Sequence, residues 1–110
     1  MSDTPHTLRQ LLQDLEAAMR AASLWSTQPP SEQAMASTMP FMYDTLQIGE
    51  WLQWVFVPRL HALLDAQASL PTNCSVHPLA EHEWTNRLPQ GGYREALALL
   101  SQIDSTLTQN

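Results

Sequence analysis

Four residues in the second half of the chain have side chains of the types that can bind zinc or act in nucleophilic catalysis. Cys74, His77, His82 and Glu83 supply a thiol, two imidazoles and a carboxylate, and all three groups are zinc ligands. A structural zinc finger would show a second cysteine pair or a close histidine pair, whereas this chain has one cysteine and its His77 precedes Pro78 at a helix start. His82 and Glu83 are also consecutive, so they point in different directions from one helix. We therefore interpret these residues as solvated polar side chains.

Other catalytic arrangements have equally weak support. Cys74 with a nearby histidine has the ingredients of a cysteine hydrolase, but no glycine-rich oxyanion turn follows it. Glu81 and Glu83 are two residues apart and face away from each other on a helix, which disfavours paired acid–base chemistry. The lone Gly91-Gly92 step comes without a lysine, so it is no phosphate loop. We expect a non-enzymatic protein with no catalytic residue, metal ion or cofactor.

Three polar side chains interrupt the most apolar stretch of the chain, residues 50–64: Gln53, Arg59 and His61. One interpretation is a pocket that binds a small apolar or aromatic ligand, with or without chemistry, since helix bundles build such pockets in their cores. A second is a half-buried Arg59 in an ion pair, because an unpaired buried charge is expensive. A third is that Arg59 contacts a partner protein. The carboxylates within reach are Asp44, Glu50 and Asp65.

The same stretch is apolar on nearly every side at helical spacing. A helix of this kind is buried all round or covered by a partner, and a 110-residue chain rarely buries the whole circumference of one helix. We therefore expect some of this surface to bind a second copy of the chain or a different protein. Trp and Arg are over-represented among interface anchors. The candidate interaction residues are Phe41, Tyr43, Trp51, Trp54 and Arg59.

Helical periodicity positions these residues within four helical segments. Apolar residues recur at three- and four-residue steps over about 5–25, 46–68, 79–87 and 92–108. Pro58 lies inside the second segment and predicts a kink there, and Trp84 of the third segment should point inward. The chain contains 17 leucines against three valines and two isoleucines, a ratio that favours helices. The fold class predicted is all-α, a four-helix bundle in a single domain spanning residues 1–110, with a proline-kinked apolar second helix.

The long connection between the first two helices has its own signals. Ser31 can cap one or two short helical turns. Met39-Pro40-Phe41-Met42-Tyr43 predicts an extended apolar connector, because proline biases the preceding residue away from helical angles. Asp44 or Thr45 is the expected cap of the second helix.

Charge limits the classes of partner. The chain carries eleven carboxylates and a net charge of −6. Binding nucleic acid directly requires a cluster of cations, so we expect no direct contact with RNA or DNA, nor with an anionic membrane surface. No apolar run is long enough to span a membrane. The absence of a leader segment and the single cysteine predict a cytoplasmic location. The basic residues are Arg9, Arg20, Arg59, Arg87 and Arg94, with no lysine.

Two segments of the chain resemble a known family. The run Ser37-Thr38-Met39-Pro40-Phe41, followed by Asp44-Thr45 and then by residues 50–60, EWLQWVFVPRL, is similar to the signature of the YqcC-like family of small bacterial proteins. The similarity covers nearly the whole chain, whereas the region of Cys74 to His82 and the Gly91-Gly92 step lie outside the signature.

The resemblance implies an all-α bundle and an association with tRNA pseudouridine synthase C, whose gene commonly neighbours those of the family. It does not imply the synthase activity. Pseudouridine synthases use a catalytic aspartate in a much larger mixed α/β domain with a basic RNA-binding cleft, whereas this chain is short, acidic and free of lysine. Asp44, the aspartate of the signature, is expected to cap a helix. Any role in RNA modification would therefore go through contact with the enzyme.

Overall fold

Every regular element in the described part of the chain is helical. The computed structural model describes residues 4–72, 74–88 and 91–108, and contains no strand within these ranges. The predicted all-α class is therefore confirmed. The first helix, α1, spans Thr4–Ala21, and its three- and four-residue apolar spacing produces one apolar face. The buried residues of that face are Leu8, Leu11, Leu12, Leu15, Ala18 and Met19.

Helix α1 ends before the predicted limit near residue 25, because the chain turns at Ser23. This residue has φ 60°, in the left-handed region. Its N–H donates to the carbonyl of Arg20 at 3.1 Å, and the N–H of Leu24 donates to the carbonyl of Met19 at 2.8 Å. These two bonds form a Schellman motif. Glycine is the usual residue at the left-handed position, so a serine there is no recognisable stop signal.

The second helical segment consists of three elements in direct succession: α3 (Ile48–Trp51), the π-helical η2 (Leu52–Phe56) and α4 (Val57–Asp65). It begins after Gln47, whose backbone N–H donates to the Glu50 carboxylate at 2.9 Å. The predicted caps, Asp44 and Thr45, are therefore wrong, because the chain is still turning at those positions. The carboxylate of Glu50 stabilises the first turn instead.

The kink predicted at Pro58 is not confirmed, and the helix instead widens just before this residue. The N–H of Val57 donates to the carbonyl of Leu52, five residues back rather than four. Proline has no N–H to donate, and in a regular helix its ring presses on the carbonyl four residues earlier, that of Trp54. We infer that the wider turn accommodates Pro58. Single π-turns inside α-helices are frequent at functional sites.

Between α1 and α3 the chain forms a short helix and a 3₁₀ turn. Helix α2 spans Glu32–Met35, and the Ser31 hydroxyl caps it by accepting from the N–H of Ala34 at 3.1 Å, as predicted. The turn η1 spans Pro40–Met42.

The extended conformation predicted for residues 39–43 is wrong. Phe41 and Met42 have φ values of 56° and 51°, both left-handed. This conformation costs a residue other than glycine about 1–2 kcal/mol. Contacts made by this connector must therefore hold it in place.

The last two helices match the predicted segments to within two residues at each end. Helix α5 spans His77–Arg87, and α6 spans Arg94–Thr108. Trp84 of α5 points inward as predicted and is 2% exposed. The buried face of α6 consists of Ala96, Leu97, Leu100, Ile103 and Leu107.

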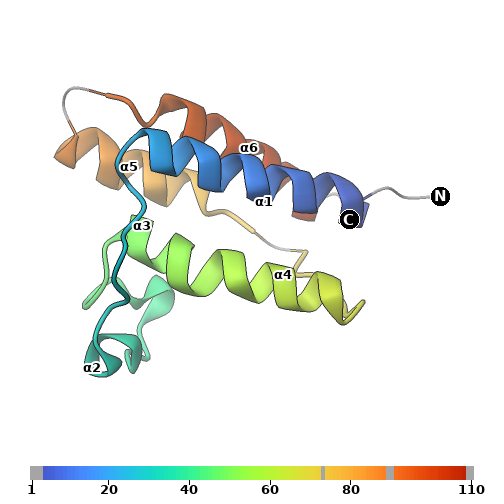
Figure 1. Cartoon of the computed structure of the whole chain (residues 1–110), viewed down its shortest axis with the longest axis horizontal. Coiled ribbons are helices and arrows are strands. Elements are labelled where there is room, and N and C mark those ends of the chain that lie inside the picture. Colours follow the sequence, from blue (N-terminus) through green and yellow to red (C-terminus); the bar gives the residue numbers. More distant parts are fainter. Residues whose placement is uncertain (1–3, 73, 89–90, 109–110) are drawn as a thin grey trace.

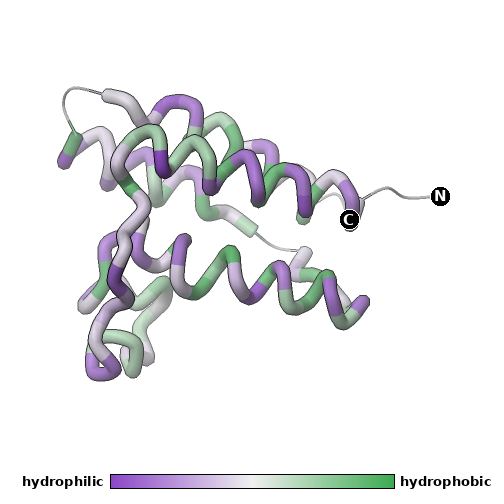
Figure 2. The backbone as a smooth tube through the Cα atoms, viewed as in Figure 1, coloured by the Kyte–Doolittle hydropathy of each residue, from purple (hydrophilic) through white to green (hydrophobic). Residues whose placement is uncertain are grey.

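Helices α1 and α6 lie side by side and run in opposite directions, above α3 and α4 (Figure 1). The α1–α6 contact is the most extensive between separate helices; α5 also packs on α6 and α3, and α4 on α1. Hydrophobic and hydrophilic residues alternate along the long helices (Figure 2), and the buried residues form one core cluster. Within the described ranges, no helix is long and apolar enough to cross a membrane. The finer description as a four-helix bundle stays a prediction.

Candidate functional site

A row of three aromatic rings joins the connector to the second helical segment. Phe41 meets Trp51 edge-on with ring centroids 4.9 Å apart, and Trp51 stacks on Phe56 at 5.2 Å. Such pairs add about 0.5–1.5 kcal/mol beyond area burial, which helps to hold the left-handed turn at Phe41. Trp51 is only 9% exposed. It is therefore a core residue, and little of it is open to a partner.

The other predicted interaction residues differ in exposure. Tyr43 is 62% exposed and Arg59 is exposed, whereas Phe41 and Trp54 are partly buried. The indole N–H of Trp54 is buried and has no hydrogen-bond partner among the described residues. The side chains of this set that a partner can reach most readily are therefore those of Tyr43 and Arg59.

The ion pair predicted for Arg59 is wrong for the described part of the chain. Asp65, six residues along the same segment, pairs with Arg9 of α1 at 3.0 Å instead. Glu50 and Asp44, the other predicted partners, accept hydrogen bonds from residues close to them in sequence. Each carboxylate thus has another partner, and Arg59 is not half-buried as expected but exposed.

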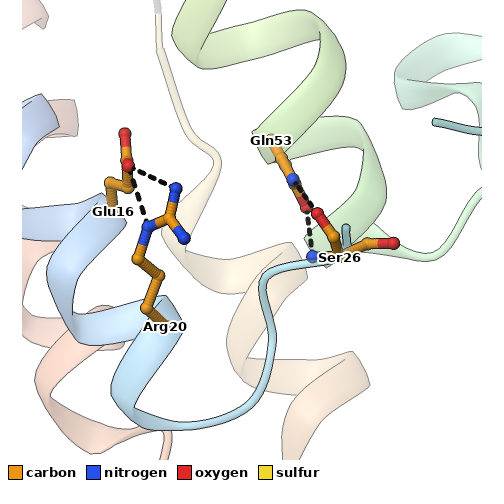
Figure 3. A network of polar contacts seen from close by, with 4 residues as sticks. All are labelled: Glu16, Arg20, Ser26 and Gln53. Carbon is orange, nitrogen blue, oxygen red and sulfur yellow. Dashed lines mark hydrogen bonds and ion pairs between the residues drawn. The ribbon is translucent and has the colours of Figure 1, made fainter. Parts of the chain in front are cut away.

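Among the cavities lined by described residues, Gln53, Arg59 and His61 are not found together. Gln53 is 6% exposed, and both ends of its side-chain amide are hydrogen-bonded to Ser26 (Figure 3). The Oε1 atom accepts from the Ser26 N–H and the Nε2 atom donates to the Ser26 carbonyl, both at 2.7 Å. Gln53 lines one cavity with Trp54, and Arg59 lines a different one. The amide of Gln53 fastens the segment after α1 to η2.

Cys74 is held as a protonated thiol by Asp104 of α6. Its Sγ atom donates to Oδ1 of Asp104 at 3.0 Å. Burial, the hydrogen bond to Asp104 and the negative charge of that carboxylate together raise the pKa of Cys74 to about 12. Because the thiolate is the nucleophilic form, Cys74 is unsuited to attack a substrate at neutral pH.

Asp104 also secures the start of α5. Its carboxylate accepts from the backbone N–H groups of Val76 and His77 at 3.1 and 2.8 Å. A carboxylate in this position satisfies amides that the helix leaves unpaired and opposes the positive end of the helix dipole. The role of Asp104 was missed from the sequence, because a partner 27 or more residues away leaves no local signal.

The remaining candidate zinc ligands are engaged separately. Glu83 accepts from the N–H of Ile48 at 2.9 Å and pairs with Arg87 at 3.5 Å. The His82 ring lies 3.4 Å from the Asn86 amide. Across residues 4–72, 74–88 and 91–108, no group of three or more His, Cys, Asp or Glu side chains is placed to hold a metal ion.

The comparison with protein families matches almost the whole chain. Residues 7–106 match the family DUF446, described as tRNA pseudouridine synthase C. The chain belongs to the DUF446 family. The family resemblance inferred from the Pro40-Phe41 and Trp51–Trp54 segments is thereby confirmed, since relatives of the chain include the Escherichia coli protein YqcC.

Relatives of this DUF446 chain fall into two length classes. The uncharacterised E. coli protein YqcC is 38% identical over 93% of this chain and 92% of its own length. An uncharacterised Haemophilus influenzae protein is 42% identical over 66% of this chain and 69% of its own length. A Pectobacterium carotovorum protein named tRNA pseudouridine synthase C is 45% identical over 73% of this chain, but the matched segment is only 21% of that protein. The DUF446 chain thus spans about a fifth of this longer relative.

A solved structure supports the helical fold. The solution NMR structure of E. coli YqcC matches with a TM-score of 0.81 and 36% identity, over 97% of this chain and 90% of that one. At this identity and coverage the two chains share one all-helical architecture.

Proposed function

We propose that this DUF446 chain is a single-domain four-helix bundle of the cytoplasm that acts without catalysis, as a protein-interaction module accessory to a tRNA pseudouridine synthase. The observation that carries the proposal is the P. carotovorum relative. In that protein, a segment similar to this chain forms a fifth of a polypeptide named as the synthase.

The length difference favours an accessory role over the synthase activity itself. Four-fifths of the P. carotovorum protein lies outside the matched segment, which leaves room for a complete enzyme domain. Joining two modules in one polypeptide keeps them at a high effective concentration. A separate chain with the same fold would achieve the same association by binding the enzyme through a non-covalent interface.

The charges of the chain support contact with the enzyme rather than with tRNA. Arg9, Arg20 and Arg87 are each paired with a carboxylate, and the net charge is −6. A protein that binds phosphates displaces counterions with clustered, available cations. The paired arginines and the excess of carboxylates oppose that mode of binding, whereas an acidic domain is compatible with a basic RNA-modifying enzyme.

The test is binding to a purified tRNA pseudouridine synthase C, measured by calorimetry and by co-elution. We expect a complex that Tyr43→Ser weakens about ten-fold, since exposed aromatic anchors contribute strongly to interfaces. Arg94→Gln, a change at an exposed residue outside the candidate set, serves as the control and should bind like the parent. Absence of a complex at about 100 μM protein would contradict the proposal, because it would mean a binding free energy weaker than about −5.5 kcal/mol. Concentration-dependent self-association lost in Tyr43→Ser would assign the surface to a second copy of the chain instead.

A further inference from the structure

A small cavity lies beside the aromatic row. It has a volume of about 170 Å³, and its walls include Phe41, Trp51, Phe56, Leu60 and Val76. An apolar cavity of about 150 Å³ accepts one benzene molecule. The cavity is therefore large enough for one aromatic or branched aliphatic side chain.

A cation borders this apolar cavity. Arg59 belongs to its lining and is exposed, and its guanidinium makes no ion pair with the described residues. Three of the other four arginines are already paired with carboxylates. A guanidinium presents a fork of donors that matches a carboxylate with two parallel hydrogen bonds. The cavity and Arg59 together complement an apolar group that lies next to a carboxylate.

Exposed apolar side chains flank Phe41 in the sequence. Phe41 lines the cavity, and Met39 and Tyr43, each two residues away along the chain, are 39% and 62% exposed. These are the large hydrophobic side chains that the described residues expose most. A ligand that used both the cavity and this exposed turn would be longer than one ring, which favours a segment of protein over a free small molecule.

We propose that the cavity beside Arg59 is an anchor pocket for one aromatic or branched aliphatic side chain of a partner protein segment, with an adjacent carboxylate of that segment bound by Arg59. The pocket deepens the proposed function and rests on it for the source of the segment, the synthase. Its chemistry can be tested without the synthase.

The test measures the binding of short peptides to the full chain. Binding is monitored through the NMR signal of the indole N–H of Trp51, a residue of the cavity wall. The probe is acetyl-Gly-Phe-Glu-Gly-amide, with the Gln version to remove the charge and the Ala-Glu version to remove the ring. We expect saturable shifts at millimolar peptide, about five-fold weaker binding by the Gln peptide, and little binding by the Ala peptide. Arg59→Gln should weaken the Phe-Glu peptide by the same factor and should not discriminate Glu from Gln. Arg94→Gln is the matched control and should behave like the parent.

Each other outcome overturns the proposal. Equal binding of the Ala and Phe peptides would show that the ring does not occupy the cavity. An unchanged affinity in Arg59→Gln would show that Arg59 does not bind the peptide carboxylate. No shift at 10 mM peptide, a concentration at which even weak fragments bind, would mean that the cavity is closed to ligands. Tighter binding of 3-phenylpropionate than of the peptide would assign the pocket to a free aromatic acid.

The two proposals fail in distinguishable ways. Peptide binding without a complex with the synthase would support the pocket and contradict the proposed partner. A synthase complex unaffected by Arg59→Gln would leave the accessory function and remove the pocket from it.

Discussion

Replacing Gln53 by leucine is expected to destabilise the protein by about 2 kcal/mol. The change keeps the size of the side chain but removes both hydrogen bonds to Ser26. Each bond contributes about 1 kcal/mol net, and leaving the part-buried backbone groups of Ser26 without partners adds about 1 kcal/mol. The additional apolar burial of leucine offsets about 1 kcal/mol of this loss.

A glutamate at position 53 tests whether the donor end of the amide matters. A carboxylate can accept from the Ser26 N–H but cannot donate to the Ser26 carbonyl, and burial also disfavours its charge. The folded-state pKa of this glutamate should therefore lie above the unfolded value of about 4.3. The stability of Gln53→Glu relative to the parent should be greatest below about pH 4.3 and should fall as pH rises through the folded-state pKa.

Urea denaturation followed by circular dichroism measures both variants. For Gln53→Leu we also expect the melting temperature to fall by about 8 °C, at about 4 °C per kcal/mol. Gln13→Leu, on the exposed face of α1, is the control and should change stability by less than about 0.5 kcal/mol. A Gln53→Leu variant as stable as the parent, or a Gln53→Glu variant whose relative stability does not depend on pH, would refute the role assigned to the amide.

Three further predictions follow from the turns, the thiol and the charge. Ser23→Gly and Gln67→Gly should each raise the free energy of unfolding by about 0.5–1 kcal/mol, because both residues adopt left-handed φ angles at helix ends; a loss of stability in denaturant titrations would contradict this. Cys74, with a pKa of about 12 against an ordinary 9.0, should react with iodoacetamide at pH 8 roughly a thousand-fold more slowly than the unfolded chain. Asp104→Asn should speed that reaction, and equal rates in the folded variant and parent would disprove the influence of the carboxylate. The isolated protein should not bind tRNA at physiological salt, and a salt-sensitive shift in fluorescence anisotropy at micromolar protein would overturn that expectation.

Helical periodicity was sufficient to find the long helices. Three- and four-residue spacing predicted the buried leucines of α1 and α6 and the inward position of Trp84. The prediction held because each helix buries the apolar face that this spacing creates. The sequence also singled out Gln53, because its amide interrupts an apolar stretch. Its partner was not, because Ser26 offers only backbone atoms, which every residue has.

The features that the sequence could not predict depend on backbone angles or on distant partners. Phe41, Ser23 and Gln67 are left-handed without being glycine, so no residue type marks those turns. Asp65 was one of three candidate partners for Arg59, but Arg9 from another helix pairs with that carboxylate. Of the five candidate interaction residues, Phe41, Trp51 and Arg59 line one cavity. The core position of Trp51, and the lack of an ion pair at Arg59 among the described residues, needed the structure.

The pairing of α1 with α6 also has a consequence for how the chain folds. The most extensive helix contact joins the first and last helices, with 72 residues between Ala21 and Arg94. Closing so long a loop carries an entropic cost that most helical proteins, rich in local contacts, avoid. During synthesis, the apolar face of α1 remains without its main partner, α6, until nearly the whole chain has been made. A nascent or truncated chain that lacks α6 would expose that face, and chaperones and proteases would act on it before any partner could.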